Sequence, residues 1–190
     1  MKIYSSTFLL ALALLFPTFS QAAWEIEPDH THVLFQVGHL GLTQTPGAFR
    51  KFQVQLNFDD EKIELSQVTL RINADSVSTV NDLRDKALCS QEWLDCASFP
   101  TITFASDHVR KLGIDNYAID GILTIRGMSI ATTFTVKLSN RTVNPWLHIP
   151  TVGFVGTAQI RRSSFGLNSF LSAISDIVDL EIRTELVKKP

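Results

Sequence analysis

The alternation of apolar and polar residues constrains the fold of this chain more than any other feature. In residues 52–58 the side chains of Phe, Val, Leu and Phe alternate with those of Gln, Gln and Asn. Such a period of two marks a β-strand with one buried face and one wet face. The pattern predicts eight strands, within residues 33–37, 52–58, 68–74, 102–104, 119–125, 134–138, 154–160 and 178–186.

Turn-forming residues separate several of these strands, among them Asp59-Asp60 and Arg126-Gly127. Two stretches lack the alternation: residues 79–98, in which Ser90 is a candidate helix cap, and residues 163–174. Antiparallel strands of this length need covered or closed edges. We therefore expect one all-β domain, a sandwich or an eight-stranded antiparallel barrel, with one or two short helices.

The first residues have the order of a secretory signal peptide. Lys2 precedes an unbroken apolar run from Phe8 to Phe16, Pro17 follows, and the small residues Ser20 and Ala22 then stand at the −3 and −1 positions of a cleavage site. The run is shorter than the roughly 20 residues that span a bilayer. We predict a signal peptide at residues 1–22, cleavage after Ala22, and an exported domain of residues 23–190.

Charge argues against nucleic acid as a partner. The whole chain carries 17 basic and 19 acidic side chains, for a formal net charge of −2, and the predicted signal peptide removes one lysine and no acid. The exported domain would therefore be slightly more acidic, with no basic cluster for a nucleic-acid backbone.

Both cysteines, Cys89 and Cys96, fall in the exported part, where an even count favours a disulfide. In one continuous helix their Cα atoms would be roughly 10 Å apart, whereas a disulfide needs about 7 Å or less. The bridge thus requires a bend, or a helix that ends before Cys96. A redox-active pair is the alternative, although the chain has no C-x-x-C spacing.

The residues on the predicted buried face are aliphatic, Phe, Gly or Ala, and none is charged. An eight-stranded barrel is either filled by side chains or holds one small ligand. An uncharged lining would suit an apolar ligand, and the small inward residues Gly121, Gly156 and Ala158 would leave space for one. The same alternation also builds a plain packed core, so periodicity leaves both interpretations open.

Few residues suggest chemistry. His30 and His32, with Asp29 and His39 nearby, could bind a transition metal, but histidines at strand ends are more often structural. Adjacent Arg84 and Asp85 are more typical of an ordered loop than of a catalytic pair. No G-x-S-x-G or phosphate-binding loop is present in the sequence. We predict neither a metal site nor an enzyme.

An ordered series of short motifs runs through almost all of residues 24–187, and together they resemble the YceI-like family of bacterial periplasmic proteins. The series consists of Asp29-His30-Thr31-His32, His39-Leu40-Gly41, Gly47-Ala48-Phe49, Asp75-Ser76-Val77-Ser78-Thr79, Arg84-Asp85 with Leu88, Phe99-Pro100-Thr101-Ile102-Thr103-Phe104, Gly121-Ile122-Leu123-Thr124-Ile125-Arg126-Gly127, Arg162-Ser163-Ser164-Phe165-Gly166 and Val178-Asp179-Leu180. Cys89 and Cys96 depart from the family, which more often has other residues there.

The resemblance implies an extended lipocalin-like barrel that encloses a polyisoprenoid, an isoprenoid quinone or a similar long lipid, with no cofactor and no catalytic residues. It also implies a periplasmic location and transient contact with a membrane or with membrane quinone proteins. The oligomeric state stays open. His39 and Arg84 are candidate contacts for a head group, and the residues expected to line the lipid channel are Phe35, Val37, Phe52, Val54, Leu56, Leu70, Ile72, Phe104, Leu123, Ile125, Phe134 and Phe154.

Two alternatives to a lipid carrier remain at this level. One is a quinone- or thiol-linked redox protein or enzyme that uses Cys89 and Cys96, or His30 and His32. The other is a structural barrel with a filled core and no cavity.

Overall fold

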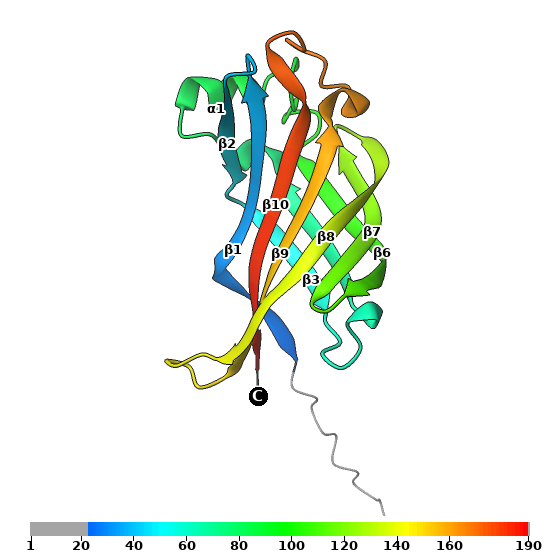
Figure 1. The fold of residues 1–190 in the computed structure, drawn as a ribbon. Coiled ribbons are helices and arrows are strands. Elements are labelled where there is room, and N and C mark those ends of the chain that lie inside the picture. The colour runs from blue at the N-terminus through cyan, green and yellow to red at the C-terminus, as the bar shows by residue number, and fades with distance from the viewer. Residues whose placement is uncertain (1–22, 190) are drawn as a thin grey trace, which may run out of the picture.

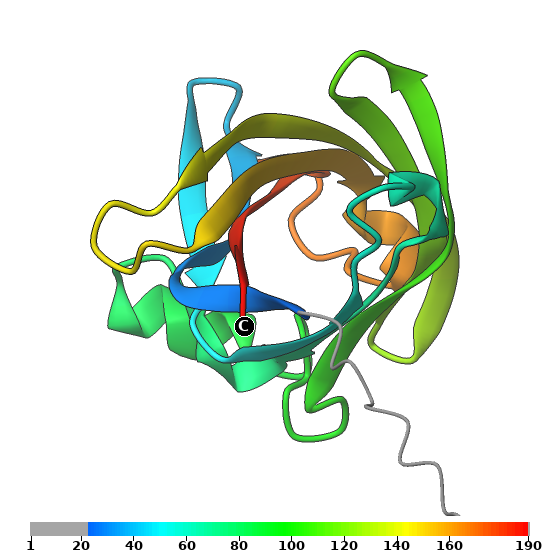
Figure 2. The ribbon, with the colours of Figure 1, turned by 90° about the horizontal axis from the view of Figure 1, so that it is seen from below.

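The computed structural model describes residues 23–189, which form an antiparallel sheet that curls into a barrel (Figures 1 and 2). The sheet has ten strands in the order β3-β4-β6-β7-β8-β9-β10-β1-β2-β5. Their bounds are β1 Trp24–His39, β2 Thr43–Phe49, β3 Phe52–Asn57, β4 Gln67–Asn73, β5 Val77–Ser78, β6 Thr101–Gly113, β7 Asn116–Ile125, β8 Met128–Val143, β9 Pro150–Arg161 and β10 Ile174–Lys188.

The all-β barrel predicted from the alternation is confirmed, with ten strands in place of eight. The two additional strands are β2 and β5. Strand β2 contains Pro46 and Gly47, which interrupt its apolar pattern, and β5 has only two residues. Neither strand is long or regular enough to show a period of two, so the sequence pattern missed both.

The barrel closes differently at its two ends, here called upper (the end that carries the helix in Figure 1) and lower. At the upper end the chain leaves β4 through a 3₁₀ turn, Ala74–Ser76, and β5 then pairs with β2. Toward the lower end, β3 pairs only with β4, and β1 before Val33 pairs only with β10. Among the described residues, a seam without ladder hydrogen bonds therefore runs between β3 and the first half of β1.

Strand β1 changes register against β10 between Glu27 and His32. The intervening bulge is held by the Thr31 hydroxyl, which donates to the Glu27 carbonyl oxygen at 2.7 Å and lies 2.9 Å from the Thr184 hydroxyl. His30 Nδ1 lies 2.6 Å from a Glu27 carboxylate oxygen. The hydrogen bond to Glu27 raises the pKa of the His30 imidazole.

The one α-helix of the described chain, α1 (Asp82–Leu88), lies outside the upper end of the barrel. Its cap is Asn81, whose side-chain oxygen accepts a hydrogen bond from the Arg84 backbone N–H at 2.9 Å, and the prediction of Ser90 as cap is wrong. Ser90 instead follows the helix, in a turn. Asn81 is the better cap because it directly precedes the acidic first turn.

The helix ends at Leu88, and a disulfide joins Cys89 to Cys96 with a Cα–Cα distance of 5.0 Å. The expectation that the helix would stop before Cys96 is therefore confirmed. Backbone bonds from Leu94 N to Leu88 O (2.9 Å) and from Cys96 N to Cys89 O (3.2 Å) fold residues 89–96 back over the helix end.

The second interruption, within residues 163–174, begins with a 3₁₀ helix, Arg162–Phe165, at the upper end. Gly166 ends it with φ of 73°, a conformation that glycine adopts without a steric penalty. The predicted signal peptide, residues 1–22, lies outside the described residues. Within residues 23–189, none of the helices has the length and apolar character needed to cross a bilayer.

Candidate functional site

The interior of the barrel is hollow in two places. An upper cavity of about 380 Å³ and a lower cavity of about 150 Å³ lie inside the sheet. The hypothesis of a filled core predicted no cavity, and the structure contradicts it. Drug-sized pockets start at about 300 Å³, so the upper cavity alone is large enough for a ligand.

The two cavities share five lining residues, which we call the waist. The waist consists of Val33, Leu70, Phe104, Phe134 and Ile182. Within the waist, the rings of Phe104 and Phe134 pack edge-to-face with centroids 5.0 Å apart. Since both cavities border the same side chains, they lie end to end along the barrel, and we call the two together the channel.

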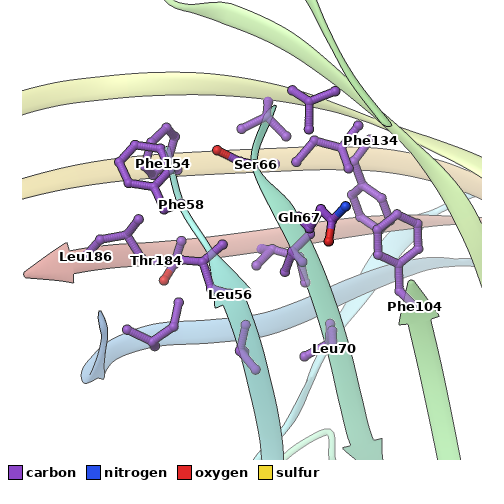
Figure 3. A pocket seen from close by; sticks show the side chains of 18 of the residues that line it. Leu56, Phe58, Ser66, Gln67, Leu70, Phe104, Phe134, Phe154, Thr184 and Leu186 are labelled. Atoms are coloured by element: carbon purple, nitrogen blue, oxygen red, sulfur yellow. The ribbon is translucent and has the colours of Figure 1, made fainter. Parts of the chain in front are cut away.

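No charged residue lines the lower cavity (Figure 3). Its walls are mostly Val, Leu, Ile and Phe. The Thr31 and Thr184 hydroxyls contact each other, and the Ser66 hydroxyl accepts a hydrogen bond from Asp59 N at 3.0 Å. The other polar side chains of the lining are Gln67 and Tyr117. A hydrocarbon can occupy this space without desolvating a charged group.

Aromatic rings close the lower end. Phe58 packs edge-to-face against Trp24 on one side and Phe154 on the other, with centroids 5.5 and 5.6 Å apart. Just beyond Phe58, the Asp60 carboxylate forms ion pairs with Arg141 and Lys188. These contacts fix the β3–β4 connection across the bottom of the barrel.

The upper cavity is also mainly apolar, but basic groups line its mouth. Its charged or titratable lining residues are His39, Arg84 and Arg162, and the lining contains no carboxylate. The charged or titratable groups that face the cavity are therefore all basic, which favours a ligand with negative charge or exposed acceptor oxygens.

Arg162 is the most buried of these basic side chains, with an exposed fraction of 3%. Its Nε donates to Ser175 O at 2.9 Å, and its terminal nitrogens donate to Leu167 O at 2.5 Å and Ile174 O at 2.8 Å. Burial lowers the pKa of the guanidinium. None of these hydrogen bonds is to a carboxylate: the guanidinium donates to backbone carbonyls, and the Asp176 carboxylate acts on it only through its charge.

Arg84 lies closer to solvent and is folded onto Thr79. Its Nε donates to the Thr79 hydroxyl at 2.7 Å and a terminal nitrogen donates to Thr79 O at 2.9 Å. The Thr79 hydroxyl donates in turn to Asp85 at 2.5 Å. Burial raises the pKa of the Asp85 carboxyl, but the hydrogen bonds from Thr79 outweigh it and leave that pKa below its usual value.

The disulfide-closed segment covers the upper cavity. Trp93 and Leu94 lie within it and belong to the lining. The Trp93 ring stacks on Phe170 with centroids 6.4 Å apart and lies 5.3 Å from the Arg162 guanidinium carbon. Two distant segments, 89–96 and 162–173, are thus joined over the upper end.

Thirteen of the predicted channel and head-group residues lie in the walls of this channel. Those that line the lower cavity, the upper cavity or both are Phe35, Val37, His39, Val54, Leu56, Leu70, Ile72, Arg84, Phe104, Leu123, Ile125, Phe134 and Phe154. That these residues contact a lipid stays a prediction.

Phe52 is the exception, and its predicted lining position is wrong. It is the first residue of β3, next to the connection from β2, and it packs against the core beside the channel. The alternation identified its buried face correctly, but a buried position at the end of a strand need not border the cavity.

Gly121 does not leave space for a ligand inside the barrel, although glycine has no side chain. A Cβ at this position would lie 2.3 Å from the Ala105 carbonyl oxygen and 2.7 Å from Phe104 Cζ, so the Phe104 ring occupies that volume. At Gly156, by contrast, the nearest atom to an added Cβ would be 3.4 Å away, and this residue lines the lower cavity.

Sequence reasoning missed Arg162. The predicted strand ends at Ile160. If its period of two is extended by two residues, position 162 also faces inward. A charged residue at an inward position was the available signal. The hypothesis of a metal site near His30 gains no support, because no group of three or more His, Cys, Asp or Glu side chains in residues 23–189 is placed to hold a metal ion.

Comparison with known proteins gives one family. The model of the YceI-like domain matches residues 24–186. The protein YceI of Salmonella arizonae is 36% identical over 181 residues, which cover 93% of this chain and 94% of that protein. A UPF0312 protein of Enterobacter sp. strain 638 is 35% identical, with 93% of each chain covered.

Solved structures share the fold at lower identity. Burkholderia cenocepacia BcnA superposes with a TM-score of 0.77 at 23% identity, covering 85% of this chain and 99% of that one. A polyisoprenoid binding domain from Saccharophagus degradans, implicated in plant cell wall breakdown, gives a TM-score of 0.58 at 14% identity, covering 89% and 99%.

Proposed function

Because this chain belongs to the YceI-like family, we propose that it is a binding or carrier protein for one long, linear, apolar lipid held inside the barrel. A polyisoprenoid or an isoprenoid quinone is the class that fits. The polyisoprenoid binding domain with the same fold supports this class.

The observation that carries the proposal is the two-section channel. Its sections of about 380 and 150 Å³ meet end to end at the waist, and its walls are aliphatic and aromatic. Each buried CH₂ group contributes about 0.8 kcal/mol, so even a few isoprene units would bind tightly. The Phe104 and Phe134 rings contact each other edge-to-face, so a bound chain would pass beside this pair, along the other residues of the waist.

The polarity of the channel orients the ligand. The tail end lies in the uncharged lower cavity, and the head group lies at the upper mouth near His39, Arg84 and Arg162. Arginine side chains only donate hydrogen bonds. The head group is therefore rich in acceptor oxygens, such as quinone carbonyls or a phosphate.

The proposed carrier works outside the cytoplasm, in the periplasm, after removal of residues 1–22. The paired Cys89 and Cys96 support export, since disulfides persist in oxidising compartments. We expect neither a cofactor besides the lipid nor catalytic turnover.

Native mass spectrometry of the gently purified exported domain, followed by organic extraction of whatever it releases, tests the proposal. We expect one bound isoprenoid-type lipid per chain. A chain that stays ligand-free and also takes up no added polyprenol or isoprenoid quinone would contradict it.

Two variants on one strand show whether the lipid lies inside. Phe154→Asp places a carboxylate in the lower cavity, and Thr157→Asp places one on the exposed face of β9. We expect the folded Phe154→Asp protein to lose the lipid and the Thr157→Asp protein to keep it. Retention in both folded variants would place the ligand elsewhere.

A further inference from the structure

Exposed apolar side chains gather at both ends of the barrel, at the lower end on the β6–β7 and β8–β9 connections, among them Ile114 and Trp146. The group at the upper end, which we call the apolar rim, lies on three separate connections. Its side chains lie in the β1–β2 turn, at the start of α1 and in the 162–173 segment (Figure 1). Leu42, Val80 and Leu83 are exposed by 78%, 93% and 84% of their surface. The rim consists of Leu40, Leu42, Val80, Leu83, Phe170 and Leu171.

Each part of the rim adjoins the mouth of the upper cavity. His39, Thr79 and Arg84 line the cavity. In the sequence, Leu40 follows His39, Val80 follows Thr79, and Leu83 precedes Arg84. Phe170 stacks on the lining residue Trp93. A backbone bond of 2.7 Å from Leu40 N to Ala173 O ties two of the rim segments together. The rim therefore surrounds the opening.

Three residues of the rim, Leu40, Val80 and Phe170, have φ values of 52°, 59° and 54°. Residues in turns elsewhere in the described chain share this left-handed region: Asp95, Asp115, Arg126 and His148. For a β-branched residue such as Val80 it is an outlier. What bears on a partner is therefore the exposure of the rim side chains and not their backbone conformation.

We propose that the apolar rim inserts into the surface of a lipid bilayer, and that the ligand passes between bilayer and channel through the opening it surrounds. This proposal rests on the proposed function, because it supplies the route by which an insoluble lipid reaches the cavity. Partitioning of the exposed leucine, valine and phenylalanine side chains out of water supplies the driving force.

Charge near the rim gives no basis for electrostatic attraction to anionic lipids. On α1 and the disulfide-closed segment, the basic residues Arg84 and Lys86 are outnumbered by acidic ones, Asp82, Asp85, Glu92 and Asp95. A basic face would seek anionic lipids. This rim is expected to bind vesicles of phosphatidylcholine alone, with little dependence on salt.

Flotation with phosphatidylcholine vesicles tests the rim directly, with or without bound lipid. We expect the parent chain to float with the vesicles and Leu42→Asp/Leu83→Asp to lose at least tenfold in vesicle affinity. The matched control is Trp146→Asp/Leu147→Asp, which charges two exposed apolar residues of the lower end and should float like the parent. Equal flotation of the rim variant and the parent, or absence of flotation in the parent, would overturn the proposal.

Val80→Gly separates insertion from folding. Glycine tolerates φ of 59°, so this variant should be at least as stable as the parent while it floats less well. Unchanged flotation would remove Val80 from the membrane contact.

Transfer of a dansyl-labelled farnesyl lipid from the protein to the same vesicles tests the route. We expect the transfer rate to rise with vesicle concentration and to fall at least tenfold in Leu42→Asp/Leu83→Asp, with unchanged equilibrium affinity for the probe. A rate independent of vesicle concentration would mean release into water and would overturn the route. Failure of the parent to bind any isoprenoid would instead count against the proposed function, while flotation still decides on the rim.

Discussion

The upper and lower ends of the channel are built in different ways. The lower cavity has an uncharged lining, the rings of Trp24, Phe58 and Phe154 pack at its end, and ion pairs of Asp60 fix the connection beyond them. The upper end carries basic side chains and is covered by two segments that meet at Trp93 and Phe170. One end is thus suited to a chain terminus and the other to a polar group and to exchange.

In the proposed carrier, this difference would give the ligand a direction within one sheet. The strands supply an apolar wall along their whole length, while the connections at each end supply the chemistry. Functional residues concentrate on such connections because a rigid scaffold positions them. Predictions that change one end and leave the other intact test whether the asymmetry governs binding.

The largest effect is expected for Arg162→Met at the upper end. The substitution leaves the carbonyl oxygens of Leu167, Ile174 and Ser175 without their donor. Since buried unpaired groups cost about 1–3 kcal/mol each and removal of a buried charge offsets part of this, we expect a loss of roughly 3 kcal/mol. Urea unfolding measures it. The control Arg161→Met removes an exposed neighbour and should change stability by about 0.5 kcal/mol or less.

Removal of the disulfide comes next. For a closed loop with a separation of 7 residues, chain entropy predicts that Cys89→Ser/Cys96→Ser loses about 2 kcal/mol. The folded variant should still bind lipid, because in the proposed carrier the bridge only holds the cover of the upper cavity. If the parent shows a redox turnover and the folded double variant loses it while still binding lipid, the result would favour the redox alternative.

Gly156→Leu should change the ligand preference of the lower end alone. The new side chain fills part of a cavity of about 150 Å³ without a close clash, since the nearest atom to its Cβ is 3.4 Å away. We expect affinity for long isoprenoids to fall about tenfold, or about 1.4 kcal/mol, and affinity for short ones to change little. Competition with isoprenoids of graded length measures the shift. Gly153→Leu on the same strand lies outside the lining and should leave the length preference unaltered.

The smallest effect is expected for Arg84→Gln, because this guanidinium is exposed and screened by solvent. Affinity for an isoprenoid with a phosphate head should fall about threefold, with no change for the corresponding alcohol. Lys86→Gln on the same helix is the control for loss of charge alone. Equal losses for both lipids would remove Arg84 from the head-group contact.

The sequence predicted the barrel well because half-buried strands leave a periodic signal. Val54, Leu56, Leu123 and Ile125 all line the channel as the alternation requires. Strand β2 was missed because Pro46 and Gly47 hide its pattern.

The alternation of apolar and polar residues could not predict the cavity. Whether inward side chains meet or leave a gap depends on their rotamers and on the curvature of the sheet, as Gly121 and Gly156 show. Arg162 was missed for a related reason, because its role depends on carbonyl groups of residues 167–175 that only the folded chain brings together.

The seam between β3 and the first half of β1 has a mechanical consequence. Elsewhere in the barrel, widening the circumference would break ladder hydrogen bonds. At the seam the strands adjoin without such bonds, so the lower part can expand at the cost of side-chain contacts alone. The circumference of the lower section can therefore increase. A lower cavity of only about 150 Å³ would in this way adjust to the bulk of a bound tail.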